Sequence, residues 1–127
     1  MKRDMDLIRE LMLKLETLPL RTGDVWLLAS YTEDIQVDGF DAEQIGYHLS
    51  LIRDAEFIDT GGIEGMDGIG FRSLTWSGHD FLDSVRSPDV WDKTKQAASA
   101  AGGFTVELLV FAAKTYLEGK IKGLIGD

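Results

Sequence analysis

A helix followed at once by a glycine-rich stretch is the feature that most restricts the fold of this 127-residue chain. Residues 41–56 open with a capping box, because Asp41 is followed three positions later by Gln44. The apolar residues that follow recur every three or four positions, as on one buried helix face: Ile45, Leu49, Ile52 and Ala55. Five glycines in residues 61–70 and an apolar run in residues 71–74 then predict a β-hairpin.

One helix is predicted near the N-terminus. Two strands are predicted between that helix and the capping box. Asp4 precedes an apolar stripe over residues 5–17 and is expected to cap that helix. Residues 25–31 are apolar and aromatic, and residues 34–38 alternate, so each segment is expected to be a strand. Gly46 leaves open whether the helix before the hairpin is continuous or broken.

Three more helices are predicted after the hairpin. Thr75 or Ser77 is expected to cap a short helix that runs through Val85. Ser87-Pro88 opens a second helix, since proline suits the first helical position, and Thr105 caps a third.

The expected fold is therefore α+β and mostly α. Its order is helix, strand, helix, β-hairpin and helix, followed by two C-terminal helices. This is the outline of a winged-helix-like core over residues 1–86. A helical extension over residues 87–127 is expected to pack on that core or across a dimer.

The last predicted helix, residues 104–125, is apolar on an unusually wide face. Leu108, Phe111 and Tyr116 lie off its main apolar stripe. A helix that is apolar on most sides must be buried on most sides. We therefore expect these three residues to pack across a homodimer or against a partner. The alternative is that the alanine-rich helix before it covers the second face.

Negative charge is concentrated in the middle of the chain. The sequence holds 13 Lys and Arg against 22 Asp and Glu, a net charge of -9. Residues 41–92 alone contain three basic and eleven acidic side chains. A generally positive surface is therefore excluded, and the middle of the chain is expected either to be a solvated acidic surface or to meet a basic partner.

Three segments carry a resemblance to a known family. They are MKRDMDLIR at residues 1–9, IGYHLSLIRDAEFI at residues 45–58 and LTWSGHDFLDSVR at residues 74–86. Trp91 and Lys95 continue the match. With these motifs the chain resembles an uncharacterised family of short bacterial and phage proteins that is similar to YjcQ-like, winged-helix-related proteins.

The resemblance implies a winged-helix-like fold and a phage or mobile-element type of protein. It implies no catalytic residues, because the family has no assigned activity. One position departs from the family pattern, since Glu56-Phe57 stands where Gly-Leu is favoured. The difference affects the predicted C-terminal end of the helix before the hairpin.

The exposed side of that helix is expected to repel DNA. If its apolar stripe is buried, the opposite face carries Glu43, Tyr47, Ser50 and Asp54, and the hairpin tip adds Glu64 and Asp67. Phosphate contacts need lysine or arginine. We therefore expect these six residues to bind a protein, such as a basic nucleic-acid-binding protein that the acidic surface inhibits by mimicking the charge of DNA.

The alternative function is a dimeric winged-helix DNA-binding transcriptional regulator. It requires a basic patch that forms only in the folded protein. Two sets of basic residues are candidates for that patch: Lys2, Arg3, Arg9 and Lys14 near the N-terminus, or Lys114, Lys120 and Lys122 near the C-terminus.

No enzyme, metal or cofactor chemistry is predicted. The chain has no cysteine, and His48 and His79 are too far apart and too isolated to form a metal-ligand motif, so both are expected to cap or pack. Trp76, Phe81 and Trp91 are expected to lie in the core. The sequence lacks a membrane-spanning apolar stretch and the apolar core of a signal peptide, so we expect a cytoplasmic protein.

Overall fold

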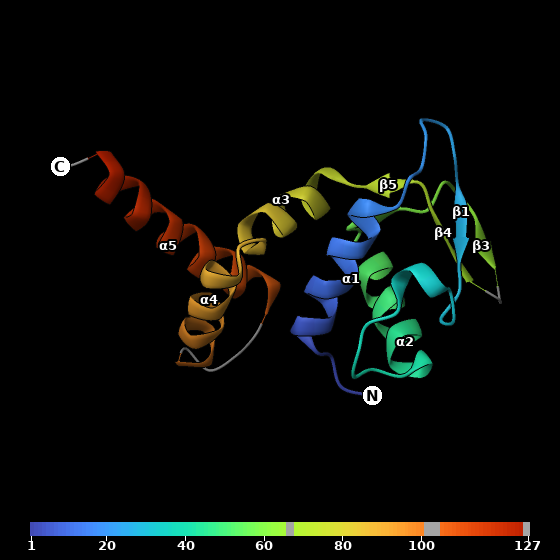
Figure 1. The fold of residues 1–127 in the computed structure, drawn as a ribbon, viewed down its shortest axis with the longest axis horizontal. Coiled ribbons are helices and arrows are strands. Elements are labelled where there is room, and N and C mark those ends of the chain that lie inside the picture. Colours follow the sequence, from blue (N-terminus) through green and yellow to red (C-terminus); the bar gives the residue numbers. More distant parts are fainter. Residues whose placement is uncertain (66–67, 101–104, 126–127) are drawn as a thin grey trace. The chain divides into compact units, whose positions relative to one another are not determined.

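The computed structural model describes residues 1–65, 68–100 and 105–125, without the side chain of Glu64 (Figure 1). Within these residues the chain forms five α-helices and two small antiparallel sheets, so the predicted α+β, mostly helical class is confirmed. The chain divides into two compact units, Met1–His79 and Asp80–Asp127. This division falls within a helix, and the domain boundary at residue 86 stays a prediction. Each unit is described by itself.

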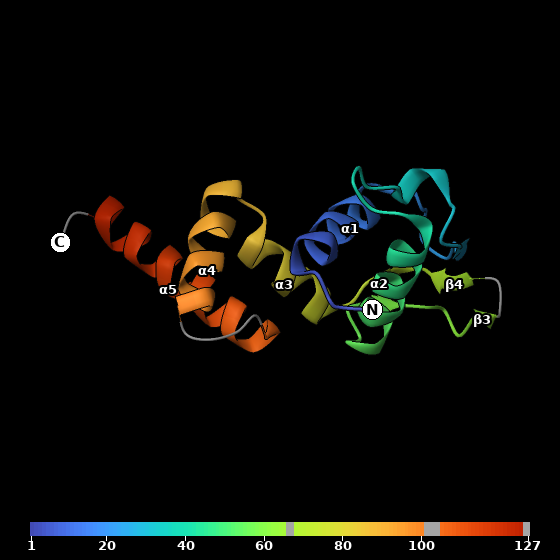
Figure 2. The same ribbon diagram turned by 90° about the horizontal axis from the view of Figure 1, so that it is seen from below.

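The first unit is built on two helices and a short turn of 3-10 helix. Its elements begin with α1 (Met5–Thr17), β1 (Trp26–Leu28), η1 (Glu33–Ile35) and α2 (Ala42–Asp54). Helix α1 packs against α2 and η1, and the two helices lie side by side in both views (Figure 2). The first helix has the predicted bounds because Asp4 Oδ1 accepts hydrogen bonds from the N–H groups of Asp6 and Leu7.

Helix α2 is continuous, and its predicted capping box is confirmed. The backbone N–H of Gln44 donates to Asp41 Oδ1, and the backbone N–H of Asp41 donates to Gln44 Oε1, both at 2.9 Å. Gly46 lies inside the helix without breaking it. A Cβ at Gly46 would stand 3.0 Å from the Cβ of Ser30, so the glycine lets α2 approach the loop after β1.

The hairpin that follows α2 consists of two separate ladders. Its strands are β2 (Ile58–Asp59), β3 (Glu64–Gly65), β4 (Gly68–Phe71) and β5 (Ser73–Leu74). Strands β2 and β5 pair antiparallel, while β4 lies between β1 and β3 in a three-stranded antiparallel sheet. The hairpin thus returns to the strand that precedes α2, with Trp26 opposite Phe71.

The predicted strand over residues 34–38 is wrong. Residues Glu33–Ile35 form η1, a single turn, in which Ile35 is fully buried. The side chain of Gln36 holds the turn by donating from Nε2 to the carbonyl oxygens of Ser30 and Thr32. One inward residue between two outward ones produces the same alternation as a half-buried strand, which explains the error.

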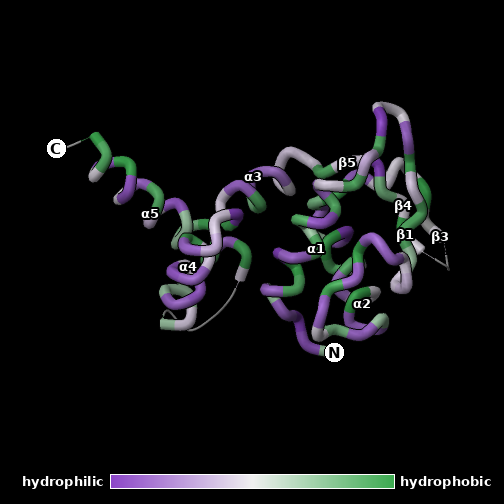
Figure 3. The backbone as a smooth tube through the Cα atoms, viewed as in Figure 1, coloured by the Kyte–Doolittle hydropathy of each residue, from purple (hydrophilic) through white to green (hydrophobic). Residues whose placement is uncertain are grey.

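The core of the first unit lies between α1, α2 and the hairpin. Its largest fully buried side chains come from α1, β1, η1 and α2: Leu7, Leu11, Met12, Leu15, Leu28, Ile35, Ile45, Leu49 and Ile52. Burying each such side chain contributes about 1.5–3 kcal/mol. The hydrophobic positions of α1 and α2 are seen in Figure 3.

Helix α3 (Trp76–Val85) begins in the first unit and ends in the second. Thr75 is confirmed as its cap, since Thr75 Oγ1 accepts a hydrogen bond from the N–H of Gly78 at 3.1 Å. The prediction that Trp76 lies in the core is wrong, because 85% of its surface is exposed, whereas Phe81 and Trp91 are buried. At 100° per residue, Trp76 lies on the side of α3 opposite its buried residues.

The second unit contains α4 (Pro88–Ala100) and α5 (Val106–Ile125), which pack on each other. Ser87 and Thr105 cap the two helices through hydrogen bonds from the N–H groups of Val90 and Leu108. The predicted end of the first of these helices, at Gly102 and Gly103, lies outside the described residues. Only Leu109 and Ala113 of α5 are buried, so most of that helix is in contact with solvent.

Candidate partner-binding surface

Four of the residues predicted to bind a partner share one face of α2, which we call the α2 face: Glu43, Tyr47, Ser50 and Asp54. Glu43, Tyr47 and Asp54 are exposed, and Ser50 is half-buried, with its Oγ donating to the carbonyl oxygen of Tyr47 at 2.6 Å. The two hairpin residues are not placed in the same way. Asp67 and the side chain of Glu64 lie outside the described residues.

The opposite side of α2 explains why this face points outward. Ile45, Leu49 and Ile52 are almost completely buried, and His48 is only 1% exposed. The His48 ring has both nitrogens engaged: its Nε2 accepts from the backbone N–H of Asp4 at 2.8 Å, and its Nδ1 donates to the carbonyl oxygen of Gln44 at 2.7 Å. His48 therefore ties the start of α1 to α2, and its packing role was predicted correctly.

The net negative charge is concentrated more strongly in residues 22–71 than in residues 41–92. Residues 22–71, from β1 through β4, contain eleven Asp and Glu but a single cation, Arg53. The remainder of the chain contains eleven acidic and twelve basic residues. The whole net negative charge therefore comes from the fifty residues that include α2 and most of the hairpin.

The cations beside this surface are already neutralised by carboxylates. Arg53 Nε donates to Asp54 Oδ1 at 3.2 Å. Arg72, on the hairpin, donates through Nε and Nη2 to Asp59 Oδ2 at 3.1 and 2.5 Å. This bond, and a weaker one from the Gly61 N–H, hold the pKa of Asp59 below its usual value. A phosphate that approached either guanidinium group would therefore also meet the carboxylate paired with it.

The approach to α2 adds further exposed carboxylates. Glu33, Asp34, Asp38 and Asp41 are exposed, and the last of them caps α2. Asp41 and Glu43, which lies in the first turn, place negative charge at the N-terminal end of α2. Carboxylates are stabilising at that position because they interact with the positive end of the helix dipole.

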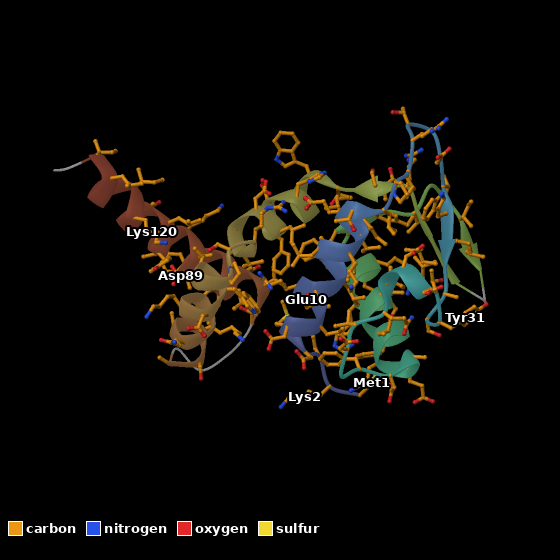
Figure 4. The ribbon with its side chains drawn as sticks, viewed as in Figure 1. Met1, Lys2, Glu10, Tyr31, Asp89 and Lys120 are labelled. Atoms are coloured by element: carbon orange, nitrogen blue, oxygen red, sulfur yellow. The ribbon has the colours of Figure 1, made fainter. Side chains whose placement is uncertain are left out.

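A polar groove borders the α2 face and was not predicted from the sequence. It has a volume of about 430 Å³ and lies between the segment after β1, helix α2 and the hairpin. Ser30, Tyr31, Gly46 and Arg53 are among its lining residues. The exposed Tyr31 is labelled in Figure 4. The feature of the sequence that could have indicated this groove is Gly46, because a glycine inside a helix often has a packing or functional reason.

Neither predicted basic patch is complete. Arg9 is buried, with 8% of its surface exposed, and its Nη1 pairs with Glu10 Oε1 at 3.1 Å. Lys14 is in the last turn of α1, roughly three helical turns from Arg3. In the second unit, Lys120 Nζ donates to Asp89 Oδ2 at 3.0 Å, and Figure 4 shows these two side chains together.

The residues predicted to pack across a dimer lie along α5. Leu108, Phe111 and Tyr116 line an apolar groove of about 590 Å³ beside α4. Phe111 is 69% exposed at its edge. Tyr116 is fixed because its hydroxyl donates to Asp89 Oδ2 at 2.9 Å, and this bond raises the pKa of Tyr116.

No metal or membrane site was found in the described part of the chain. Within residues 1–65, 68–100 and 105–125, no group of three His, Cys, Asp or Glu side chains is arranged to hold a metal ion. None of the helices described here combines the length and the apolar character needed to cross a membrane.

Comparisons with known proteins identify the family. Residues 2–104 match a family described as "Hypothetical protein (DUF2513)". A relative from Haemophilus influenzae, described as an uncharacterized protein, is 40% identical over 98 residues, which cover 75% of this chain and 76% of the relative. No solved structure gives a significant match. The expected membership of an uncharacterised family is thus confirmed, and the chain belongs to the DUF2513 family.

Proposed function

We propose that the first unit is a winged-helix-like domain that binds a basic protein through the α2 face instead of binding DNA. The order α1, β1, η1, α2 and hairpin supports this fold, with η1 in the place of a second helix. The return of β4 to pair with β1 supports it further. The resemblance of the three sequence motifs supports a phage or mobile-element type of protein.

The observation that carries the proposal is the charge of residues 22–71. In a DNA-binding helix-turn-helix arrangement, the N-terminal residues of the recognition helix contact the bases. Here the corresponding end of α2 has Asp41 as its cap and Glu43 in its first turn. Binding to DNA gains affinity by releasing counterions from phosphates that lysine or arginine neutralises. Carboxylates at this end oppose that gain.

A basic protein partner fits the same surface. Opposite charges across an interface accelerate association and favour one partner over others. Tyr47 supplies an exposed aromatic ring of the kind that often contributes strongly to protein interfaces. In its most specific form, the proposal is that the acidic surface occupies the nucleic-acid channel of the partner and inhibits it.

The proposal is tested by capturing partners from a host extract with the full chain and its variants. The variant Glu43→Lys/Asp54→Lys reverses two charges on the α2 face, and Asp80→Lys/Asp92→Lys makes the same change of charge elsewhere. We expect a nucleic-acid-binding protein whose affinity falls at least about tenfold with the first variant only. Equal binding of the captured partner to the unmodified chain and to both variants would contradict the proposal. The proposal would also be contradicted if nucleic acid did not compete with the chain for that partner.

The second candidate is a DNA-binding regulator, which the arrangement of α2 beside a hairpin favours. Its mark would be DNA binding by the unmodified chain that weakens as salt is added. A gel-shift titration with genomic fragments at low salt distinguishes the two functions, since the acidic surface predicts no shift.

A further inference from the structure

One face of α5 is exposed along its whole length and has no partner within the described residues. Its members are spaced alternately by four and three positions: Glu107, Phe111, Lys114, Glu118, Ile121 and Ile125. We call this set the α5 stripe. At 100° per residue it spans only about 80° of the helix, well away from the buried Leu109 and Ala113.

Three of the six members of the α5 stripe are large apolar residues, on a face where a solvated helix would be polar. Phe111, Ile121 and Ile125 are 69%, 53% and 74% exposed. Figure 3 shows hydrophobic residues continuing to the end of the described helix. Alternate spacings of four and three are the pattern of helix pairs that pack along a seam. The stripe therefore has the form of a helix–helix interface.

The four central members of the stripe are self-complementary when the helix is reversed, whereas the outer pair, Glu107 and Ile125, is not. Two antiparallel copies of α5 centred on residue 116 place Phe111 opposite the partner's Ile121. The same register places Lys114 opposite the partner's Glu118. In an isologous interface each of these contacts occurs twice. Within the described residues, Lys114 and Glu118 form no ion pair with any other side chain, so both charges are available.

We propose that the α5 stripe is the interface with a second copy of this chain, in an antiparallel and symmetric helix pair. The charge complementarity of Lys114 and Glu118 selects this occupant over an unrelated apolar surface. A single pair of helices buries less area than a permanent dimer does, so we expect a dimer that dissociates reversibly on dilution. This proposal concerns the second unit and stands independently of the function proposed for the α2 face.

Charge reversal tests the proposal in solution. Sedimentation of the full chain over a range of concentrations should show a reversible dimer. Lys114→Glu and Glu118→Lys should each raise the dissociation constant at least about tenfold, because each substitution places like charges together twice. The double variant Lys114→Glu/Glu118→Lys should restore dimerisation, since the pairs are remade with opposite polarity. Asp92→Lys on α4 is the control for the change of charge.

The antiparallel register is tested by crosslinking, which the absence of native cysteines makes simple. A mixture of the Lys114→Cys and Glu118→Cys chains should be joined by a short thiol crosslinker faster than either chain is joined to itself. Faster joining of either variant to itself would overturn the proposed register. A chain that remains monomeric at all concentrations, or a double variant that fails to regain association, would overturn the interface.

Discussion

Helices α1 and α5 use their apolar residues in opposite ways. Helix α1 buries seven of its 13 residues, whereas α5 buries two of its 20. Yet α5 is the more apolar of the two along its sequence. The difference shows that apolar content does not by itself define a core, because a helix is buried only where neighbouring elements cover it. In the first unit α2, η1 and β5 contact α1, while in the second unit α4 covers one side of α5.

The largest expected effect comes from removing a core leucine of the first unit. Leu11→Ala deletes a fully buried side chain of α1 and should lower the free energy of unfolding by about 3 kcal/mol. Leu124→Ala removes the same atoms from an 87% exposed position of α5 and should change it by less than about 0.5 kcal/mol. Urea unfolding followed by circular dichroism measures both. Similar losses for the two variants would show that α5 is covered in solution.

A second pair of substitutions compares close packing with open space. A Cβ at Gly78 would overlap the carbonyl oxygen of Phe57, so Gly78→Ala should destabilise the protein by about 2 kcal/mol. Gly119, in α5, has no neighbouring atom within 4 Å, so Gly119→Ala should instead stabilise it by up to about 1 kcal/mol. Thermal melting of the two variants should therefore shift in opposite directions. Shifts of the same sign would contradict either the close packing at Gly78 or the open space at Gly119.

The end of α2 is expected to improve when glycine is introduced. Glu56 has a φ of 60°, a left-handed conformation that favours glycine. The N–H groups of Glu56 and Phe57 bond to the carbonyl oxygens of Arg53 and Ile52, which completes a Schellman motif around this residue. Glu56→Gly should therefore stabilise the protein by about 1 kcal/mol. Chemical denaturation measures the change, and a loss of stability would mean that the Glu56 side chain makes a contribution of its own.

The smallest expected effect concerns the ion pair of the second unit. The hydrogen bond from Lys120, followed by that from Tyr116, lowers the pKa of Asp89. The stabilisation is therefore present above the usual pKa of aspartate and is lost as the pH falls through the lowered value. Asp89→Asn should remove this dependence on acid pH and leave the stability of the first unit unchanged. The unfolding midpoints of the unmodified protein and of Asp89→Asn, compared above and below pH 4, measure this pH dependence. Parallel pH profiles of the two proteins would contradict the prediction.

Local chemistry made much of the fold predictable. Asp4, Asp41, Thr75 and Thr105 each cap a helix as expected, because a cap depends on residues within one turn. Errors arose where distant packing decides. Residues 34–38 alternate as a strand does, but the contact of η1 with α1 makes them a turn around Ile35. The exposure of Trp76 likewise depends on which side of α3 is covered.

The candidate surface was predictable in part for the same reason. The outward position of Glu43, Tyr47 and Asp54 follows from the period of α2 alone. The pairing of Arg72 with Asp59 depends on the register of the hairpin, so sequence spacing did not indicate it. The polar groove required the approach of the segment after β1 to Gly46, which is a contact between distant parts of the chain.

The central claim is that the α2 face repels polyanions, and DNA binding tests it most directly. Fluorescence anisotropy of labelled duplex DNA should show no saturable binding by the unmodified chain at low salt. The Glu43→Lys/Asp54→Lys variant should acquire weak binding that added salt abolishes, while Asp80→Lys/Asp92→Lys should not. Saturable, salt-sensitive binding by the unmodified chain would contradict the claim.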